Sequence, residues 1–258
     1  MAAHIVGPLH RVTVGETGPS MVFLHPNPLD WSCWLYQMTH FSSRYRTIAV
    51  DLPGYGWSPA ALDGLTMTDV ADACWEAIDE LSGEPAVLVG CSLGSWVAMH
   101  MAHQRPDAVS AVVLSGVGYS PGKEFAPKRI SGYEEHGIAY RRTHAYEVVS
   151  ESFGTSARGR YLIESILERD NTVDIFTVIE MFRALGEPDP AWFWTALKPP
   201  CLIITGELDN AHQRALALAD HIPGVEIVTL ADAGHTCCME QPWDFDDALA
   251  DFLRRLDP

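Results

Sequence analysis

Short apolar segments alternate with longer helical patterns along most of this chain. The apolar segments are nearly continuous, as is typical of strands buried on both faces of a parallel sheet. They lie at residues 21–24, 47–52, 86–89, 111–114, 201–205 and 226–230. The helical patterns lie at residues 31–41, 66–81, 93–104, 211–222 and 243–256. This order predicts an α/β fold in which a mostly parallel central sheet is flanked by helices on both faces.

Two local signals refine this prediction. Residues 6–14 predict one more strand, either in an antiparallel hairpin or at an edge of the sheet. Thr66 stands directly before a helical pattern and has a side chain suited to cap the first turn of a helix. We therefore expect a helix to begin at Thr66.

The segment between two of the predicted strands, residues 119–197, contains no strand pattern. Its helical patterns lie at residues 138–152, 159–169 and 173–185. The segment is too long for an ordinary connection between a strand and a helix, and too structured for a loop. We therefore expect a core domain formed by residues 1–118 and 198–258, with an inserted helical cap at residues 119–197.

The size and charge of the chain limit the function classes. With 258 residues, of which 47% are hydrophobic, the chain can bury the core of a single domain with an insertion. It has 34 acidic and 17 basic residues, for a formal net charge of −17. Contact with phosphates needs a dense basic surface, and the chain has none. We therefore expect no nucleic-acid partner and no anionic membrane partner.

The ends of the chain and its cysteines suggest a reducing compartment. The first fifteen residues lack the basic and apolar regions of a secretory signal. No apolar stretch reaches the roughly 18 residues that a membrane helix needs. The cysteines form no Cys-x-x-Cys pair, so we expect free thiols in a cytoplasmic protein. A metal or redox site at Cys237 and Cys238 is the less favoured alternative, and we expect no metal.

The segment Gly90-Cys91-Ser92-Leu93-Gly94 lies directly between a predicted strand and a predicted helix. In a Gly-x-Ser-x-Gly turn the chain bends so sharply that the central serine is strained and its hydroxyl is exposed. The glycines allow neighbouring backbone to approach closely. The pattern and its position therefore predict a nucleophile elbow, with Ser92 as the nucleophile.

A nucleophilic serine needs a base to accept its proton and an acid to orient that base. In this class of fold the acid and then a histidine follow the serine along the chain. Asp209 and His235 each come just after a predicted strand, at the sheet edge where ligands bind. Asp209 alone could simply cap a helix, and Glu207 and Asp232 compete with it. Order and position favour Ser92, Asp209 and His235 as the catalytic residues.

The oxyanion formed by attack on a carbonyl also needs hydrogen-bond donors. One donor is expected to be the backbone N–H of Leu93, which follows the nucleophile. The second is expected in the loop His25-Pro26-Asn27-Pro28, after the first central strand. Proline has no N–H, so only His25 and Asn27 can donate there. We predict Asn27 as the second donor, whereas the alternative interpretation is an ordinary proline-rich turn.

Five short motifs follow one another along the chain. They are His25-Pro26-Asn27-Pro28 with Trp34 after it, the segment 51–58 (DLPGYGWS), Gly90-Cys91-Ser92-Leu93-Gly94, Gly206-Glu207-Leu208-Asp209, and Gly234-His235 followed by Glu240-Gln241-Pro242. In these motifs the chain resembles the α/β-hydrolase superfamily over essentially its whole length. The resemblance implies the α/β-hydrolase fold, a triad of Ser92, Asp209 and His235, a helical lid and no cofactor. The chain departs from the common pattern at Pro26 and Ser95, where glycine is usual.

The subclass depends on the nucleophile and the loops. Haloalkane dehalogenases and epoxide hydrolases have a loop that resembles residues 25–28, but their nucleophile is an aspartate. Ser92 therefore argues against membership of either enzyme class. Carbon–carbon bond hydrolases differ in the oxyanion loop and in the residues after His235. Residues 222–242 are similar to the matching stretch of 3-oxoadipate enol-lactonases. We therefore expect hydrolysis of a small-molecule ester or lactone, with a carbon–carbon bond hydrolase, an acyltransferase and a hydrolase-fold ligand receptor as alternatives.

The predicted cap is expected to form the substrate pocket. Phe182, Trp192 and Trp194 give it an aromatic character, and His25 is expected beside them. Arg141 is a candidate to hold a substrate carboxylate. Packing in the core explains the aromatic residues equally well, and a solvated helix face is the alternative for Arg141. The only partner that we expect is the small-molecule substrate, with a homodimer as an open alternative.

Overall fold

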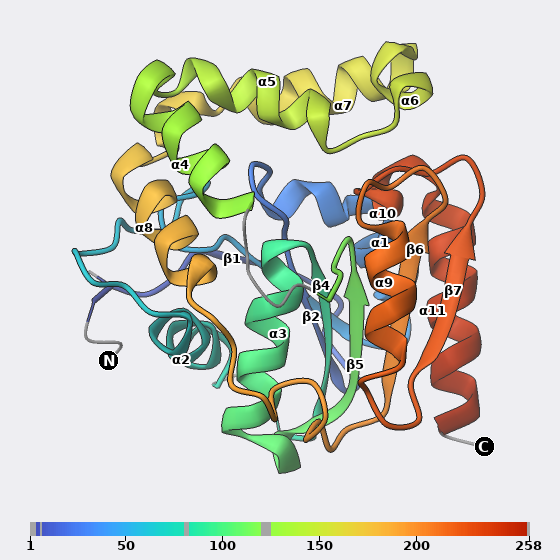
Figure 1. Ribbon diagram of the computed structural model, residues 1–258. Coiled ribbons are helices and arrows are strands. Elements are labelled where there is room, and N and C mark those ends of the chain that lie inside the picture. Colours follow the sequence, from blue (N-terminus) through green and yellow to red (C-terminus); the bar gives the residue numbers. More distant parts are fainter. Residues whose placement is uncertain (1–3, 6, 80–82, 120–124, 257–258) are drawn as a thin grey trace.

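The computed structural model describes residues 4, 5, 7–79, 83–119 and 125–256. Within these residues, seven strands form one sheet in the order β1-β3-β2-β4-β5-β6-β7 (Figure 1). All neighbouring strands are parallel except β1, which pairs antiparallel with β3 at one edge. The strands are β1 (Arg11–Val14), β2 (Ser20–Leu24), β3 (Arg46–Val50), β4 (Ala86–Cys91), β5 (Val109–Ser115), β6 (Cys201–Gly206) and β7 (Glu226–Leu230).

The sheet separates two apolar cores. Along β2, Met21 and Phe23 point into one core, and Val22 and Leu24 point into the other. Both faces of the central strands are therefore buried, which explains their uninterrupted apolar sequence. Helices α1 (Leu35–Phe41) and α11 (Pro242–Leu256) cover the face of Met21, and α2 (Met67–Ile78), α3 (Leu93–Gln104) and α9 (His212–Ala219) cover the face of Val22.

Between β5 and β6, the part of the sequence that the structure describes forms five α-helices, which we call the cap helices. Figure 1 shows them as a layer above the edge at which the strands β5 and β7 end. Helix α8 packs against α4 and also contacts α2 of the core. The cap helices are α4 (Phe125–His136), α5 (Ala139–Glu147), α6 (Glu151–Thr155), α7 (Ala157–Leu167) and α8 (Ile175–Gly186). The domain boundaries at residues 119 and 197 stay a prediction, and residues 120–124 lie outside the described residues.

The structure confirms the predicted α/β fold, and the six predicted strands correspond closely to β2 through β7. The strand predicted within residues 6–14 is the edge strand β1. Thr66 caps α2 as expected, because its hydroxyl accepts the N–H of Asp69 and the Asp69 carboxylate accepts the N–H of Thr66. Helix α2 ends at Ile78, and the predicted end at residue 81 lies outside the described residues.

The cap helices differ most from their prediction. Helix α4 was not predicted, because Ala126 and Tyr133 are its only buried residues and its sequence shows little apolar periodicity. The helix predicted at residues 138–152 is two helices, α5 and α6, separated near Ser150. Ser150 has extended backbone and its hydroxyl accepts the N–H of Phe153, so it starts a new helix. The described residues also contain three 3₁₀ elements, Trp31–Trp34, Pro106–Ala108 and Asp170–Thr172, and a short helix, Cys237–Glu240.

Trp34 is the largest side chain that is completely buried in the described residues, and it provides a test of the packing. Its ring centroid lies 5.2 Å from that of Phe23 on β2 and 5.9 Å from that of Phe245 on α11. Truncation leaves a cavity between the sheet and this helix layer. We expect Trp34→Ala to lower the free energy of unfolding by about 3–5 kcal/mol in urea denaturation. Trp57→Ala, at a tryptophan that is 65% exposed, is the matched control and should change it little.

Candidate active site

The turn after β4 holds Ser92 in an unusual backbone conformation. Its φ of 52° and ψ of −116° lie outside the favoured regions for a residue with a Cβ. The Ser92 N–H donates to the Ser115 carbonyl of the neighbouring strand, with an N···O distance of 2.7 Å. This bond fixes the turn against β5, and the Ser92 side chain lines a pocket at the sheet edge.

Two glycines and one serine make this turn possible. A Cβ atom at Gly94 would lie 2.0 Å from the Leu24 carbonyl oxygen, and a Cβ atom at Gly90 would lie 2.3 Å from the Gly94 carbonyl oxygen. A larger residue at either position would therefore clash with the backbone. Ser95 is fully buried, and its hydroxyl lies 2.9 Å from the Gly90 carbonyl oxygen and 2.8 Å from that of Ser115. The departure from glycine at Ser95 therefore adds a side-chain link between the turn and β5.

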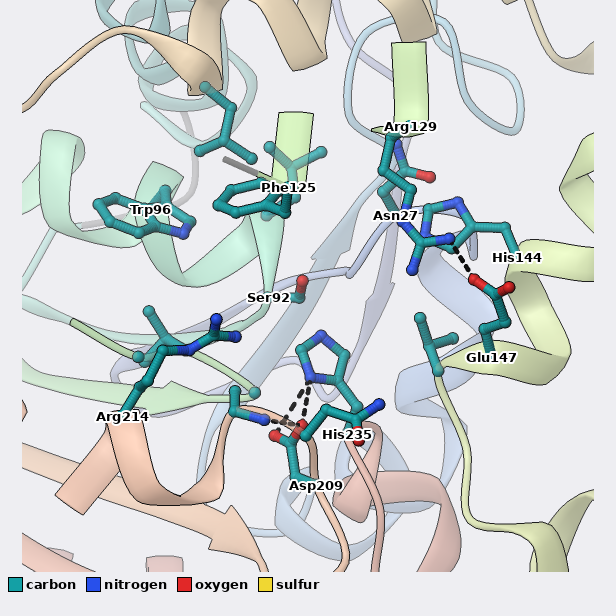
Figure 2. A pocket seen from close by; sticks show the side chains of 18 of the residues that line it. Asn27, Ser92, Trp96, Phe125, Arg129, His144, Glu147, Asp209, Arg214 and His235 are labelled. Atoms are coloured by element: carbon teal, nitrogen blue, oxygen red, sulfur yellow. Dashed lines mark hydrogen bonds and ion pairs between the residues drawn. The ribbon is translucent and has the colours of Figure 1, made fainter. Parts of the chain in front are cut away.

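The structure brings Asp209 and His235 together from the ends of β6 and β7. The Nδ1 of His235 lies 3.0 and 3.1 Å from the two carboxylate oxygens of Asp209. Since the ionised carboxylate only accepts, this contact assigns the proton to Nδ1 and leaves Nε2 free. Figure 2 shows Ser92 on the other side of the imidazole from Asp209. No hydrogen bond joins Ser92 to His235 within the residues that the structure describes.

The pairing changes the acidity of both groups. Burial by itself lowers the pKa of His235, but the charge of Asp209 and its hydrogen bond outweigh burial and raise this pKa to about 9. Burial likewise raises the pKa of Asp209, and this effect is outweighed by the charge of His235 and the hydrogen bonds from His235 and the Ala211 N–H. The pKa of Asp209 is consequently below its usual value. Each partner therefore stabilises the charged form of the other.

Glu240 holds the loop that carries His235. Its side chain is 2% exposed, and one carboxylate oxygen accepts the Gly234 N–H at 2.9 Å and the Ser150 N–H at 3.0 Å. The Thr236 N–H also donates to the Val148 carbonyl oxygen at 3.2 Å. The loop is thus fastened to the segment that joins α5 and α6. The sequence showed Glu240 only as part of a family motif, because nothing in its neighbourhood indicates that it is buried.

The predicted oxyanion donors line the same pocket. The backbone N–H groups of Asn27 and Leu93 donate to no carbonyl or side chain in the described parts of the chain. Asn27 is only 4% exposed, and its side-chain oxygen accepts from the Tyr133 hydroxyl at 3.4 Å. Its side-chain Nδ2 is buried without a hydrogen-bond partner among the described residues. The site therefore has donors that no acceptor among the described residues uses.

The pocket has an apolar side and a polar side. Figure 2 shows Trp96 and Phe125 on one side of Ser92, and Arg129, His144 and Glu147 on the other. Burial, and the positive charge of Arg129 after it, hold the pKa of His144 well below its usual value, so this imidazole is neutral. The other lining residues include Val117, Val148, Phe182, Leu185, Asn210, Ala211 and Arg214.

Of the five predicted pocket residues, only Phe182 lines the pocket. His25 is completely buried beneath it, where its Nε2 accepts the Leu52 N–H at 2.9 Å and its Nδ1 lies 3.0 Å from the Pro26 carbonyl oxygen. Trp192 is 52% exposed on the outside, and Trp194 packs edge-on behind Trp96 with centroids 4.8 Å apart. For these three residues the prediction was wrong, because they support the pocket or face solvent.

The prediction for Arg141 was also wrong. Its side chain is 1% exposed and lies outside the lining of the pocket. The guanidinium forms an ion pair with Asp170 at 2.6 Å, and its Nε donates to the Pro28 carbonyl oxygen at 2.9 Å. Arg141 therefore joins a cap helix to the loop of Asn27. A charge so deeply buried and paired is not available to a substrate.

Sequence reasoning missed several lining residues, namely Trp96, Phe125, Arg129, His144, Glu147 and Arg214. Arg129 and Phe125 belong to α4, which was not predicted. The others lie on helices whose orientation toward the pocket depends on tertiary packing. Only Trp96 had a local signal, since it lies on the helix that begins at the elbow.

The described part of the chain contains no group of three or more His, Cys, Asp or Glu residues arranged to hold a metal ion. Cys237 and Cys238 are buried free thiols, as are the remaining cysteines. Burial raises the pKa of both thiols well above the usual value of a cysteine, so they stay protonated.

None of the helices described has the length and apolar character to cross a membrane.

Comparison with known sequences identifies relatives of several kinds. The model of the Alpha/beta hydrolase family matches residues 21–251. The dihydrolipoyllysine-residue acetyltransferase component of the acetoin cleaving system of Cupriavidus necator is 29% identical over 251 residues, which are 93% of this chain and 64% of that protein. Epoxide hydrolase 3 of Siraitia grosvenorii is 37% identical over 192 residues, which are 71% of this chain and 60% of that protein. The chain thus spans less than two thirds of the length of either relative.

Comparison with solved structures gives matches over almost the whole chain. An esterase from Thermogutta terrifontis, solved with malate bound, has a TM-score of 0.84 and 26% identity, covering 97% of this chain and 94% of the esterase. The enol-lactonase from Burkholderia xenovorans has a TM-score of 0.85 and 23% identity, covering 95% of this chain and 96% of the lactonase. At that identity, the likeness to the lactonase concerns the fold alone.

The contact between His235 and Asp209 can be tested by titration. We expect the ¹⁵N NMR resonances of the His235 imidazole to titrate near pH 9 in the wild-type protein. In Asp209→Asn the charge that favours the imidazolium is lost while burial remains, so the pKa should fall below that of a free histidine. Asp232→Asn, at the acidic residue that competes with Asp209 in the sequence, is the control and should leave the pKa of His235 unchanged. An unchanged titration in Asp209→Asn would contradict the assignment.

Proposed function

The chain belongs to the alpha/beta hydrolase family, and we propose that it is a serine hydrolase that cleaves a carboxylic ester or a lactone of a small molecule. One observation carries this proposal: the Asp209–His235 pair, with Nδ1 and carboxylate 3.0 Å apart, shares a pocket with Ser92 at a strained turn. In acyl transfer His235 serves as the base, Asp209 as the acid that orients it, and Ser92 as the nucleophile.

The first step is the attack of Ser92 on the substrate carbonyl. Neutral His235 accepts the Ser92 proton at Nε2, and the Ser92 oxygen forms a bond to the carbonyl carbon. Asp209 stabilises the resulting imidazolium and keeps the ring oriented. The Ser92 hydroxyl and His235 form their hydrogen bond when the substrate is bound, since catalytic contacts often tighten only then.

The oxyanion that develops is stabilised by donors already in place. We assign this role to the backbone N–H groups of Asn27 and Leu93, which are not engaged elsewhere in the described chain. Donors fixed before the reaction need no reorganisation as the charge forms. Arg141 supports this arrangement because it holds the Pro28 carbonyl, one residue from Asn27.

The acyl-enzyme is then cleaved by water. His235 donates its proton to the departing alcohol oxygen, and the acyl group stays on Ser92. Water, deprotonated by His235, attacks the acyl carbonyl and releases the carboxylic acid and the free serine. A lactone is a cyclic ester and follows the same steps, except that the alcohol stays attached to the acyl group.

The nucleophile separates this reaction from epoxide opening, although epoxide hydrolases are among the relatives. A carboxylate that opens an epoxide forms an ester, which water can hydrolyse at its carbonyl. Ser92 would form an ether, which has no carbonyl, and the enzyme would remain alkylated. Ser92 therefore favours ester and lactone substrates, in accord with the resemblance to the Thermogutta esterase at 26% identity.

Removal of the nucleophile tests the proposal directly. We expect Ser92→Ala to lower kcat for p-nitrophenyl esters by at least about a thousandfold, because the acyl-enzyme cannot form. It should also abolish covalent labelling by a fluorophosphonate, measured by mass spectrometry. Ser110→Ala, at an exposed serine of β5, is the matched control and should keep both. Full activity of Ser92→Ala toward these esters would contradict the proposal.

The pKa of His235 predicts the pH dependence. The base must be neutral, so activity is lost as the pH falls through the His235 pKa of about 9. We expect kcat/KM for a neutral ester to rise about tenfold per pH unit below that value and to level off above it. In Asp209→Asn the inflection should move to lower pH, with a much lower plateau. A wild-type profile that is flat from pH 6 to 9 would show that His235 is not the titrating base.

A further inference from the structure

Arg214 differs from the other arginine that lines the pocket. Arg129 forms an ion pair with Glu147. The Arg214 guanidinium makes no hydrogen bond or ion pair with any residue in the described ranges, although the chain has twice as many acidic as basic residues. A guanidinium stays charged at all accessible pH values and has five N–H donors in a planar fork. Arg214 is therefore available to an anion that enters the pocket.

The backbone of Arg214 is fixed while its side chain is exposed. The Tyr119 N–H donates to the Arg214 carbonyl oxygen at 3.0 Å, and the Tyr119 ring stacks on His221 with centroids 4.1 Å apart. These contacts join α9 and the residues just after it to the segment that follows β5. Figure 2 shows the Arg214 side chain extending from α9 into the pocket that contains Ser92. The fold thus fixes the backbone from which the charged side chain reaches the pocket.

The nearby carboxylate of Asp209 does not neutralise Arg214. Both Asp209 oxygens face Nδ1 of His235, and one also accepts the Ala211 N–H at 2.8 Å. The charge of Arg214 contributes to the lowered pKa of Asp209, but the two side chains form no ion pair. The other carboxylate in the lining, Glu147, is occupied by Arg129. The charge left without a partner in this pocket is positive.

A second group in the pocket also lacks an acceptor. The Asn27 side chain is 4% exposed, its oxygen accepts from Tyr133, and its Nδ2 is buried without a partner in the described chain. An unpaired buried donor is costly, and a bound molecule with an acceptor oxygen would remove that cost. The Arg214 guanidinium and the Asn27 amide thus both complement a ligand rich in oxygen acceptors.

We propose that the natural substrate carries a carboxylate separate from the carbonyl that Ser92 attacks, and that Arg214 binds this carboxylate at the pocket. The apolar part of the substrate lies against Trp96, Phe125 and Phe182. The guanidinium donates two N–H groups, one to each oxygen of the carboxylate, in a bidentate contact. The proposal rests on the proposed function, since it names the substrate class of the same site. It also explains how a chain with a net charge of −17 can bind an anion, because a local cation offsets long-range repulsion.

A pair of esters of equal acyl length tests this assignment. The six-carbon acyl chain of p-nitrophenyl hydrogen adipate ends in a carboxylate, and that of p-nitrophenyl hexanoate ends in a methyl group. We expect Arg214→Gln to lower the adipate-to-hexanoate ratio of kcat/KM roughly tenfold or more. Arg214→Lys should retain part of the preference, and Arg214→Glu should lower the ratio further. Arg160→Gln, at an exposed arginine of α7, is the matched control and should leave the ratio unchanged.

A binding experiment separates this inference from the proposed reaction. In Ser92→Ala, which cannot turn over, we expect monomethyl adipate to bind more tightly than methyl hexanoate in NMR titration, and Arg214→Gln in that background to remove the difference. An unchanged difference in that double variant, or an unchanged ratio in the kinetic test, overturns the role of Arg214. A selective effect of Arg214→Gln on monomethyl adipate supports the inference even if Ser92-dependent hydrolysis fails, which would overturn the proposed function alone.

Discussion

The turn between β4 and α3 constrains the rest of this molecule. A helix that begins immediately after the strand must pass very close to β2. A Cβ atom at Gly94 would lie only 2.0 Å from the Leu24 carbonyl oxygen. The same bend holds Ser92 at a φ of 52°. Local sequence cannot stabilise such a conformation, so the bonds of Ser92 and Ser95 to Ser115 of β5 hold it in place. The strained serine is thus stabilised by the parallel sheet behind it.

The other loops at the same edge are also held from outside. The Asn27 loop is fixed by Arg141 from a cap helix, and the His235 loop is fixed by Glu240, which also binds the Ser150 N–H. Both contacts are buried, where hydrogen bonds to charged groups are strong and breaking them is costly. The cap helices therefore do more than cover the pocket: they position backbone and side chains of the core.

The charges that line the pocket differ from the net charge of the chain. The chain is strongly acidic, yet the two carboxylates that line the pocket are each paired, Asp209 with His235 and Glu147 with Arg129. Pairing with Asp209 raises the pKa of His235 to about 9. Arg214 forms no ion pair with any of the described residues, although its charge contributes to the lowered pKa of Asp209. The charge of the residues that line the pocket therefore differs from the strongly acidic charge of the whole chain.

The sequence by itself determined the strands, the elbow and the positions of Asp209 and His235, because these depend on local apolar runs and on residues placed directly after them. The tertiary structure decided the pocket. Arg141 and Trp194 suggested a substrate site by residue type, and packing buried both, while Arg129 and Arg214 reached the pocket from helices whose orientation no local pattern specifies. Strand order and loop chemistry are local properties, whereas the direction of a side chain on a helix depends on which neighbours that helix packs against.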